Sequence, residues 1–184
     1  MCVVDAAVSG VAQLGDIVYV VYAKSCVIEM FTADALLPLG KGIHIEGMVD
    51  PSDIVACHHD RQLYIADYCI WRVSADDHSS IEWLQADTFN IYALSLRSRH
   101  LLVTSGRRSV RQYSTSDRRL LCVVELPLYI KELHHAVETL RGTLVVCHKG
   151  TSHDQEKYNV SIFCVLKITY HQITELIIET TITR

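Results

Sequence analysis

Apolar and polar residues along this 184-residue chain form short runs of strand length, separated by polar turns. Four segments share one order: an apolar strand, a short turn of polar or small residues, and a second strand in which apolar and polar positions alternate. They are DIVYVVYAKSCVIEMF (16–31), QLYIADYCIWRV (62–73), HLLVTSGRRSVRQY (100–113) and GTLVVCHKG…YNVSIFCV (142–165). This recurrence predicts an internal repeat.

The repeat length follows from the end of the first strand in each segment. Aligned at Tyr22, Asp67, Ser105 and Cys147, these ends are 45, 38 and 42 residues apart. Each segment is preceded by one more apolar run (AVSGVAQL, DIVACHH, IYALSLR and IKELHHAV) and followed by another (GIHIEGMV, SSIEWLQA, RLLCVVELP and HQITELIIE). Four strands at a period of roughly 40 residues are typical of one β-propeller blade.

A helical interpretation fits less well, because β-branched and aromatic residues dominate and no segment keeps helical apolar spacing for three turns. IKELHHAVETL (130–140) could form a short helix, but its register with the other units favours a strand. Trp71 and Trp83 fall on adjacent strands of one blade, and we expect both to pack between blades.

The segment LYIADYCIWRV resembles the NHL-repeat and related six-bladed propeller families, whose hallmark is an apolar strand ending in Asp, a short turn and an Arg–apolar pair. Here Asp67, Arg72 and Val73 match the hallmark, whereas the other three units lack the Asp and the turn is shorter than usual. HHAVETLRGTLVVCHKG also resembles blades of large invertebrate propeller proteins. The resemblance implies a fold rather than an activity, and we expect Asp67 and Arg72 to act as a charged pair that fixes the hairpin.

We therefore expect an all-β fold: a β-propeller of about four four-stranded blades, as a partial copy of a six-bladed ring. The expected blades are residues 1–49, 50–90, 91–128 and 129–184. A ring that closes with four blades is the alternative. An open set would expose a blade face at each end, which predicts a dimer through these open faces.

Composition narrows the function classes. The formal charge of −4 argues against a dedicated nucleic-acid binder, and no apolar run approaches the roughly 20 residues of a membrane-spanning helix. The seven cysteines are odd in number, scattered and without a C-x-x-C pair, and the amino terminus lacks the pattern of a secretory signal. We expect reduced thiols, no membrane association and a cytoplasmic location.

The histidines are the candidate metal ligands. His58, His59, His134 and His135 fall in or at the end of predicted inner strands, which line a propeller channel, and His148 is a further candidate. Some propeller lyases hold zinc with channel histidines, so a zinc or calcium site of a lyase or hydrolase is one alternative. The other blades offer no matching third ligand, so we expect no cofactor.

Arginines gather between residues 97 and 119, and the candidates for RNA or partner binding are Arg97, Arg99, Arg107 and Arg108. Alternate hairpins open on opposite rims, so the group of Arg97 and Arg99 lies away from that of Arg107 and Arg108. Some NHL propellers bind single-stranded RNA on a basic rim, which gives a second alternative.

The sequence contains no nucleophile elbow and no glycine-rich phosphate loop. The predicted function is therefore a non-catalytic propeller module, of a scaffold or ligase-associated kind, that binds protein partners through its rim loops. Loops on a rigid scaffold are where binding residues concentrate. The polar insertion at 151–159 is one such loop.

Overall fold

The computed structural model describes residues 7–85, 90–105, 108–128, 130, 132–149, 158–164 and 182–183, and every regular element among them is a β-strand. The first two sheets contain β1 (Val8–Leu14), β2 (Ile17–Tyr22), β3 (Val27–Thr32), β4 (Ile43–His44), β5 (Asp53–Cys57), β6 (Gln62–Ala66), β7 (Cys69–Ser74) and β8 (Ser80–Gln85). The other two contain β9 (Ile91–Arg97), β10 (His100–Ser105), β11 (Ser109–Ser114), β12 (Leu120–Glu125), β13 (Glu132–Glu138), β14 (Thr143–Lys149), β15 (Tyr158–Cys164) and β16 (Ile182–Thr183).

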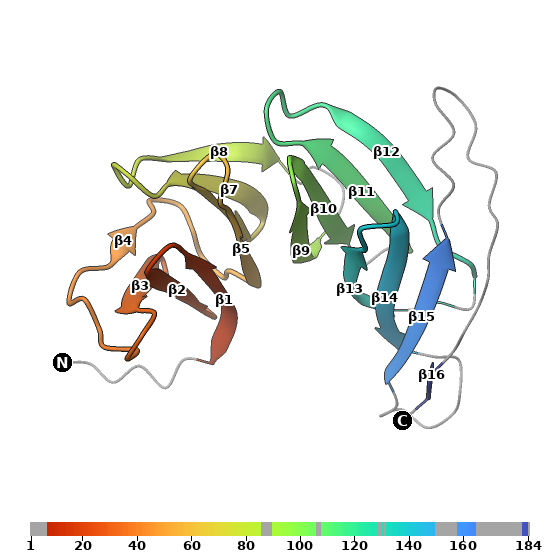
Figure 1. Ribbon diagram of the computed structural model, residues 1–184, viewed down its shortest axis with the longest axis horizontal. Coiled ribbons are helices and arrows are strands. Elements are labelled where there is room, and N and C mark those ends of the chain that lie inside the picture. The colour runs from red at the N-terminus through yellow and green to blue at the C-terminus, as the bar shows by residue number, and fades with distance from the viewer. Residues whose placement is uncertain are drawn as a thin grey trace.

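Each sheet is an antiparallel meander of four strands that follow one another in the chain. The sheets stand side by side in an open arc, with β1, β5, β9 and β13 on its inner side and the first and fourth sheets at its two ends (Figure 1). Neighbouring sheets meet through these inner strands, β1 with β5, β5 with β9 and β9 with β13. The expected all-β fold, a partial β-propeller of four-stranded blades, is confirmed.

The expected strands recur with one difference of extent. The fourth strand of the first sheet covers only Ile43–His44, shorter than the expected run 42–49. The chain turns at Gly47 (φ 91°), which lies against the indole ring of Trp71. In the fourth sheet the segment 130–140 contributes strand β13, so the strand interpretation is confirmed there. The run 171–179 and most of the insertion, 151–157, lie outside the described residues.

Three apolar clusters hold the arc together, one at each junction between sheets. The cluster between the first and second sheets includes Tyr19, Met30 and Leu63, with Trp71 packed against it. At the next junction Trp83 is buried between Tyr64 and Tyr113. The two tryptophans thus pack between blades, as predicted, and they do so on opposite faces of the second sheet because side-chain direction alternates along each strand.

The strand pairings also correct the alignment of the fourth repeat. Leu63, Leu101 and Leu144 take the same place, on the second strand of their sheet and facing the preceding sheet. Counting from them, Asp67 and Ser105 correspond to His148 rather than to Cys147. All three equivalent residues are buried polar groups, so His148 belongs to the blade framework.

Candidate functional site

The two residues of the expected hairpin pair have separate roles. Asp67 is buried, and its carboxylate accepts hydrogen bonds from the backbone N–H groups of Val49 and Asp50, both at 3.0 Å. The indole N–H of Trp71 donates to the same carboxylate at 3.4 Å. Asp67 thereby fixes the connection that enters the second sheet. No ion pair joins Asp67 to Arg72, because Arg72 follows Trp71 and so points to the opposite face of the sheet.

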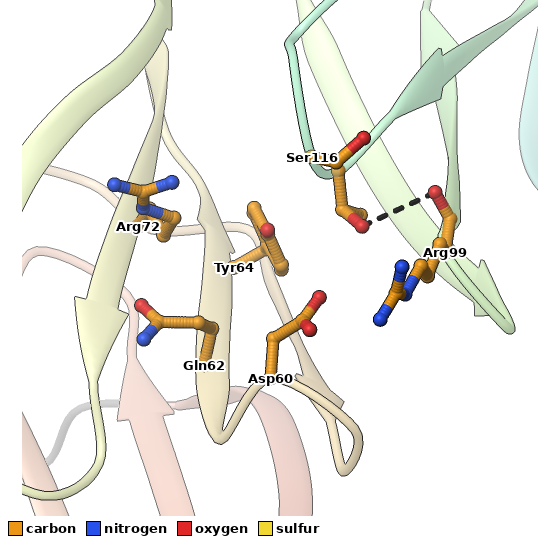
Figure 2. A pocket seen from close by; sticks show the side chains of 7 residues that line it. Asp60, Gln62, Tyr64, Arg72, Arg99 and Ser116 are labelled. Atoms are coloured by element: carbon orange, nitrogen blue, oxygen red, sulfur yellow. Dashed lines mark hydrogen bonds between the residues drawn. The ribbon is translucent and has the colours of Figure 1, made fainter.

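On that opposite face, Arg72 lines a pocket of about 400 Å³ between the second and third sheets. We call it the rim pocket, and its lining residues are Asp60, Gln62, Tyr64, Arg72, Arg99, Thr115 and Ser116. Figure 2 shows Arg72 and Gln62 on one side of the Tyr64 ring, with Asp60, Arg99 and Ser116 on the other. The second sheet supplies the first group and Asp60, and turns of the third sheet supply Arg99 and Ser116.

Backbone contacts of the third sheet fix one wall of the rim pocket. The carbonyl oxygen of Arg99, in the β9–β10 turn, accepts a hydrogen bond from the backbone N–H of Thr115 at 2.9 Å and from its hydroxyl at 3.2 Å. The β9–β10 and β11–β12 turns therefore lie side by side on one rim. This shared rim agrees with the alternation of hairpins that the sequence predicted.

The Tyr64 hydroxyl of the rim pocket stays protonated at neutral pH. Burial raises the pKa of Tyr64 to about 12, so its hydroxyl remains a hydrogen-bond donor. The guanidinium of Arg99 contacts Nε2 of His59, and that imidazole lies 3.7 Å from the Asp60 carboxylate. Arg72 is half-buried, and it forms no ion pair with any residue that the structure describes.

The remaining arginine candidates are divided between other places. Arg97 donates to Oε1 of Glu138 at 2.6 Å and to the backbone oxygen of Leu140 at 2.7 Å, so it joins the third and fourth sheets. Arg108 lies between β10 and β11, on the rim opposite to Arg99. Arg107 lies outside the described residues. The structure therefore brings Arg99 together with Arg72, and not with Arg97 or Arg108.

The candidate metal ligands are also dispersed. His58 and His59 lie in the turn after β5, on the rim, rather than within the inner strand. His134 and His135 lie on β13, where a register shift between Leu133 and His135 interrupts the alternation of side chains. Nε2 of His134 is 3.8 Å from Glu132, and Nε2 of His135 is 4.0 Å from Oδ2 of Asp53. Within the described ranges, no three His, Cys, Asp or Glu residues are grouped as metal ligands.

Asp53 links three inner strands near the axis of the arc. Its carboxylate accepts hydrogen bonds at 2.8 Å from the backbone N–H groups of Leu94 on β9 and of Ile54 on its own strand. His135 of β13 faces the same carboxylate. Burial raises the pKa of Asp53 above its usual 3.8, against the lowering effect of these partners.

This raised pKa predicts a pH dependence of stability. A carboxyl group with a raised folded-state pKa stabilises the fold below its unfolded value of 3.8, and that contribution is lost as the pH rises through the folded pKa. Relative to Asp53→Asn, the native chain should therefore lose free energy of unfolding as the pH rises above about 4. Urea unfolding of both chains across this range, repeated with His135→Gln to remove the imidazole, measures it. A difference that does not vary with pH would contradict the prediction.

The buried thiol of Cys57 and the half-buried thiol of Cys69 bear on whether the chain has a cysteine nucleophile. Burial raises the pKa of Cys57, and it raises the pKa of Cys69 to about 12. The thiolate is the nucleophilic form, so neither side chain is activated at neutral pH. Cys26, Cys57, Cys69 and Cys147 are free thiols. Among the described residues there is no helix with the length and apolarity that crossing a membrane requires.

Sequence reasoning identified Arg72 and Arg99 but not the pocket that they share. Gln62, Tyr64, Thr115 and Ser116 carry no motif, and only the alternation along β6 and β7 could have placed Tyr64 and Arg72 on one face. That the turn at Thr115 meets the second sheet depends on how two blades pack, which no local pattern specifies.

Comparison with known proteins supports the fold. No family model and no curated protein matches the sequence. Among solved structures, similarity is found to hydrazine synthase of Kuenenia stuttgartiensis (TM-score 0.68, 16% identity, 93% of this chain and 54% of that chain). A nidogen/laminin complex matches with a TM-score of 0.66 and 15% identity, over 83% of this chain and 59% of that chain. The β-propeller domain of Cps50 (Swd1) from Myceliophteria thermophila matches with a TM-score of 0.65 and 9% identity, over 91% of this chain and 56% of that chain.

These three similarities show a shared propeller fold, and at such identities they show the fold alone. This chain spans between 54 and 59% of the length of the three proteins. The computationally designed Ika4 protein, by contrast, is matched over 92% of its length, with a TM-score of 0.64 and 13% identity. The more specific NHL assignment remains a prediction from the segment around Asp67.

Proposed function

We propose that this chain is a non-catalytic β-propeller module that binds a protein partner through the rim carrying the rim pocket. The observation that carries the proposal is the pocket itself, in which the half-buried Arg72 has no charged partner among the described residues. Binding residues concentrate in loops that a rigid scaffold positions, and the turns at Asp60, Arg99 and Ser116 meet that condition.

The arrangement also favours recognition over covalent chemistry. Arg72, Arg99, Tyr64 and Gln62 supply hydrogen-bond donors around one pocket, which suits the orientation of a bound group. The nearby Cys57 has a raised pKa, so the rim pocket offers no activated thiol. A partner side chain that enters the pocket would be held by polar contacts while the rest of the partner covers the rim.

Selection of peptides from a random display library on the immobilised chain tests the proposal. Ser116→Trp places a large ring at the exposed mouth of the rim pocket, and we expect it to weaken the selected peptides at least about tenfold. Arg108→Ala, on the opposite rim, is the matched control and should leave binding unchanged. Peptides that lose affinity with Arg108→Ala and keep it with Ser116→Trp would place the binding surface on the other rim and refute the proposal.

Single-stranded RNA binding and a metal-dependent lyase or hydrolase remain the alternative hypotheses. The RNA hypothesis would use Arg99 with Arg118 and Arg119 of the adjacent turn, because Arg97 is already paired with Glu138. The metal hypothesis would use Asp53 and His135 at the inner strands. Salt-dependent retention of RNA would support the first, and stoichiometric zinc or calcium in the purified protein would support the second.

A further inference from the structure

The three junctions between sheets repeat one arrangement of side chains, and the middle junction departs from it. At each junction a residue on the second strand of one sheet packs in one cluster with a leucine on the second strand of the next sheet. The pairs are Tyr19 with Leu63, Tyr64 with Leu101 and Leu102 with Leu144. These pairs define equivalent positions on the neighbouring strands.

Two further positions are then defined at each junction by the strand pairings. The third strand of the earlier sheet contributes Met30 opposite Tyr19, Arg72 opposite Tyr64 and Gln112 opposite Leu102. The first strand of the later sheet contributes Ala56 opposite Leu63, Leu96 opposite Leu101 and Glu138 opposite Leu144. The junctions thus carry Met30 with Ala56, Arg72 with Leu96, and Gln112 with Glu138.

The first and third of these combinations are chemically matched. Met30 and Ala56 are apolar members of one cluster, so no polar group is left to satisfy. At the third junction the amide of Gln112 donates to Oε2 of Glu138 at 2.9 Å, while Arg97 donates to Oε1. One carboxylate therefore satisfies the polar side chain on the third strand and an arginine on the inner strand.

The second junction has a charged side chain, Arg72, on the third strand of the earlier sheet, but it has no carboxylate on the first strand of the later sheet. Arg72 takes the place of Gln112, but the residue in the place of Glu138 is Leu96, whose alkyl side chain packs in the apolar cluster. A charged group that is withdrawn from water normally has a partner of opposite charge. The rim pocket opens beside Arg72 at this same junction, and an acidic group that enters it could supply the missing carboxylate.

We propose that the rim pocket binds the carboxylate of an aspartate or glutamate side chain supplied by the protein partner, in the role that Glu138 fulfils at the next junction. The inference rests on the proposed function and names the group that is recognised. Arg72 offers a bidentate guanidinium, and Gln62, Tyr64 and Arg99 supply further donors around the same volume. Arg72 and Arg99 against Asp60 leave a formal charge of +1, which suits one carboxylate better than a dianionic phosphoryl group.

The test uses a minimal probe, N-acetylglutamate α-amide, whose only charge is the side-chain carboxylate. Its neutral isostere, N-acetylglutamine α-amide, is the matched control, and inorganic phosphate is the third ligand. Binding is followed on the folded chain by the NMR signals of the arginine Nε–H groups. We expect saturable shifts at Arg72 and Arg99 with the glutamate probe, and none with the glutamine probe.

Two substitutions taken from the chain's own repeats test the role of Arg72. Arg72→Met copies the first junction and should weaken the glutamate probe roughly 10- to 100-fold, as expected for a charge-assisted hydrogen bond. Leu96→Glu copies the third junction, so it should pair with Arg72 internally and abolish binding while Arg72 remains present. Arg108→Met, on the opposite rim, should leave the affinity unchanged.

Several outcomes would overturn the inference. They are equal shifts with the two probes, full affinity in Arg72→Met, or tighter binding of inorganic phosphate than of the glutamate probe. The two proposals can fail separately. If library peptides bind at the rim without an acidic residue, only the carboxylate inference fails. If the glutamate probe binds through Arg72 but no peptide is selected, the proposed protein-binding function fails.

Discussion

Trp83→Ala should lower the free energy of unfolding by about 3–5 kcal/mol, the usual cost of removing a fully buried aromatic side chain. Trp83 is only 2% exposed, and its ring lies edge-on between the rings of two tyrosines. The distance between ring centroids is 5.2 Å to Tyr64 and 6.2 Å to Tyr113. These two tyrosines belong to different sheets, so the Trp83 side chain fills the space between the second and third sheets. Its removal leaves a cavity that two twisted sheets cannot close by moving together.

Urea unfolding of the native chain and the variant measures this loss. Tyr92→Ala is the matched control, because Tyr92 is also an aromatic residue on a strand but is 48% exposed, and its substitution should change stability by less than about 0.5 kcal/mol. A loss below about 1 kcal/mol for Trp83→Ala would mean that the second and third sheets do not depend on this cluster for their contact.

Glu138→Ala should have the next largest effect, a loss of about 3 kcal/mol, because it removes the partner of a largely buried cation. The Glu138 side chain is 4% exposed and that of Arg97 is 28% exposed, with 2.6 Å between Oε1 and the guanidinium. The amide of Gln112 would lose its acceptor as well. The third and fourth sheets would then retain their apolar cluster, the hydrogen bond from Ser95 to Ala136 and the one from Arg97 to the backbone oxygen of Leu140.

A second ion pair with the same distance between nitrogen and oxygen serves as the control. Arg61 and Asp76 are also 2.6 Å apart, but their side chains are 55% and 63% exposed. Water screens such a pair, so Asp76→Ala should cost much less than Glu138→Ala. In a double-mutant cycle, Arg97→Met combined with Glu138→Ala should cost less than the sum of the single changes. Equal costs for Glu138→Ala and Asp76→Ala would contradict the role assigned to burial.

The repeat and its strands could be predicted from the sequence because they depend on local order. Alternation of apolar and polar residues specifies which face of a strand is buried, and turn residues such as Gly15 specify where it reverses. Trp71 and Trp83 were placed between blades for that reason. The fourth unit is displaced by one residue from the alignment that the sequence predicts, since only the packing of Leu144 in the place of Leu63 and Leu101 distinguishes His148 from Cys147.

The candidate site could not be predicted in the same way. Arg97, Arg99 and Arg72 are all arginines near strand ends in the sequence, but Arg97 is neutralised by Glu138, Arg99 meets His59 and Arg72 meets no carboxylate among the described residues. The partners of Arg97 and Arg99 are residues about 40 positions away in the chain, on the adjacent blade. A propeller brings such residues together at every junction, so one repeat read alone does not show its partners.

The sequence by itself therefore determined the architecture: an all-β chain, four repeats and the apolar faces that join them. Each of these follows from the period of side-chain direction along a strand and from the spacing of the turns. Only the tertiary structure decided which polar side chains are satisfied across a junction. It matched Gln112 with Glu138 and left Arg72 lining the rim pocket, with Leu96 in the position equivalent to Glu138, because contacts between blades depend on register and packing rather than on neighbours in the chain.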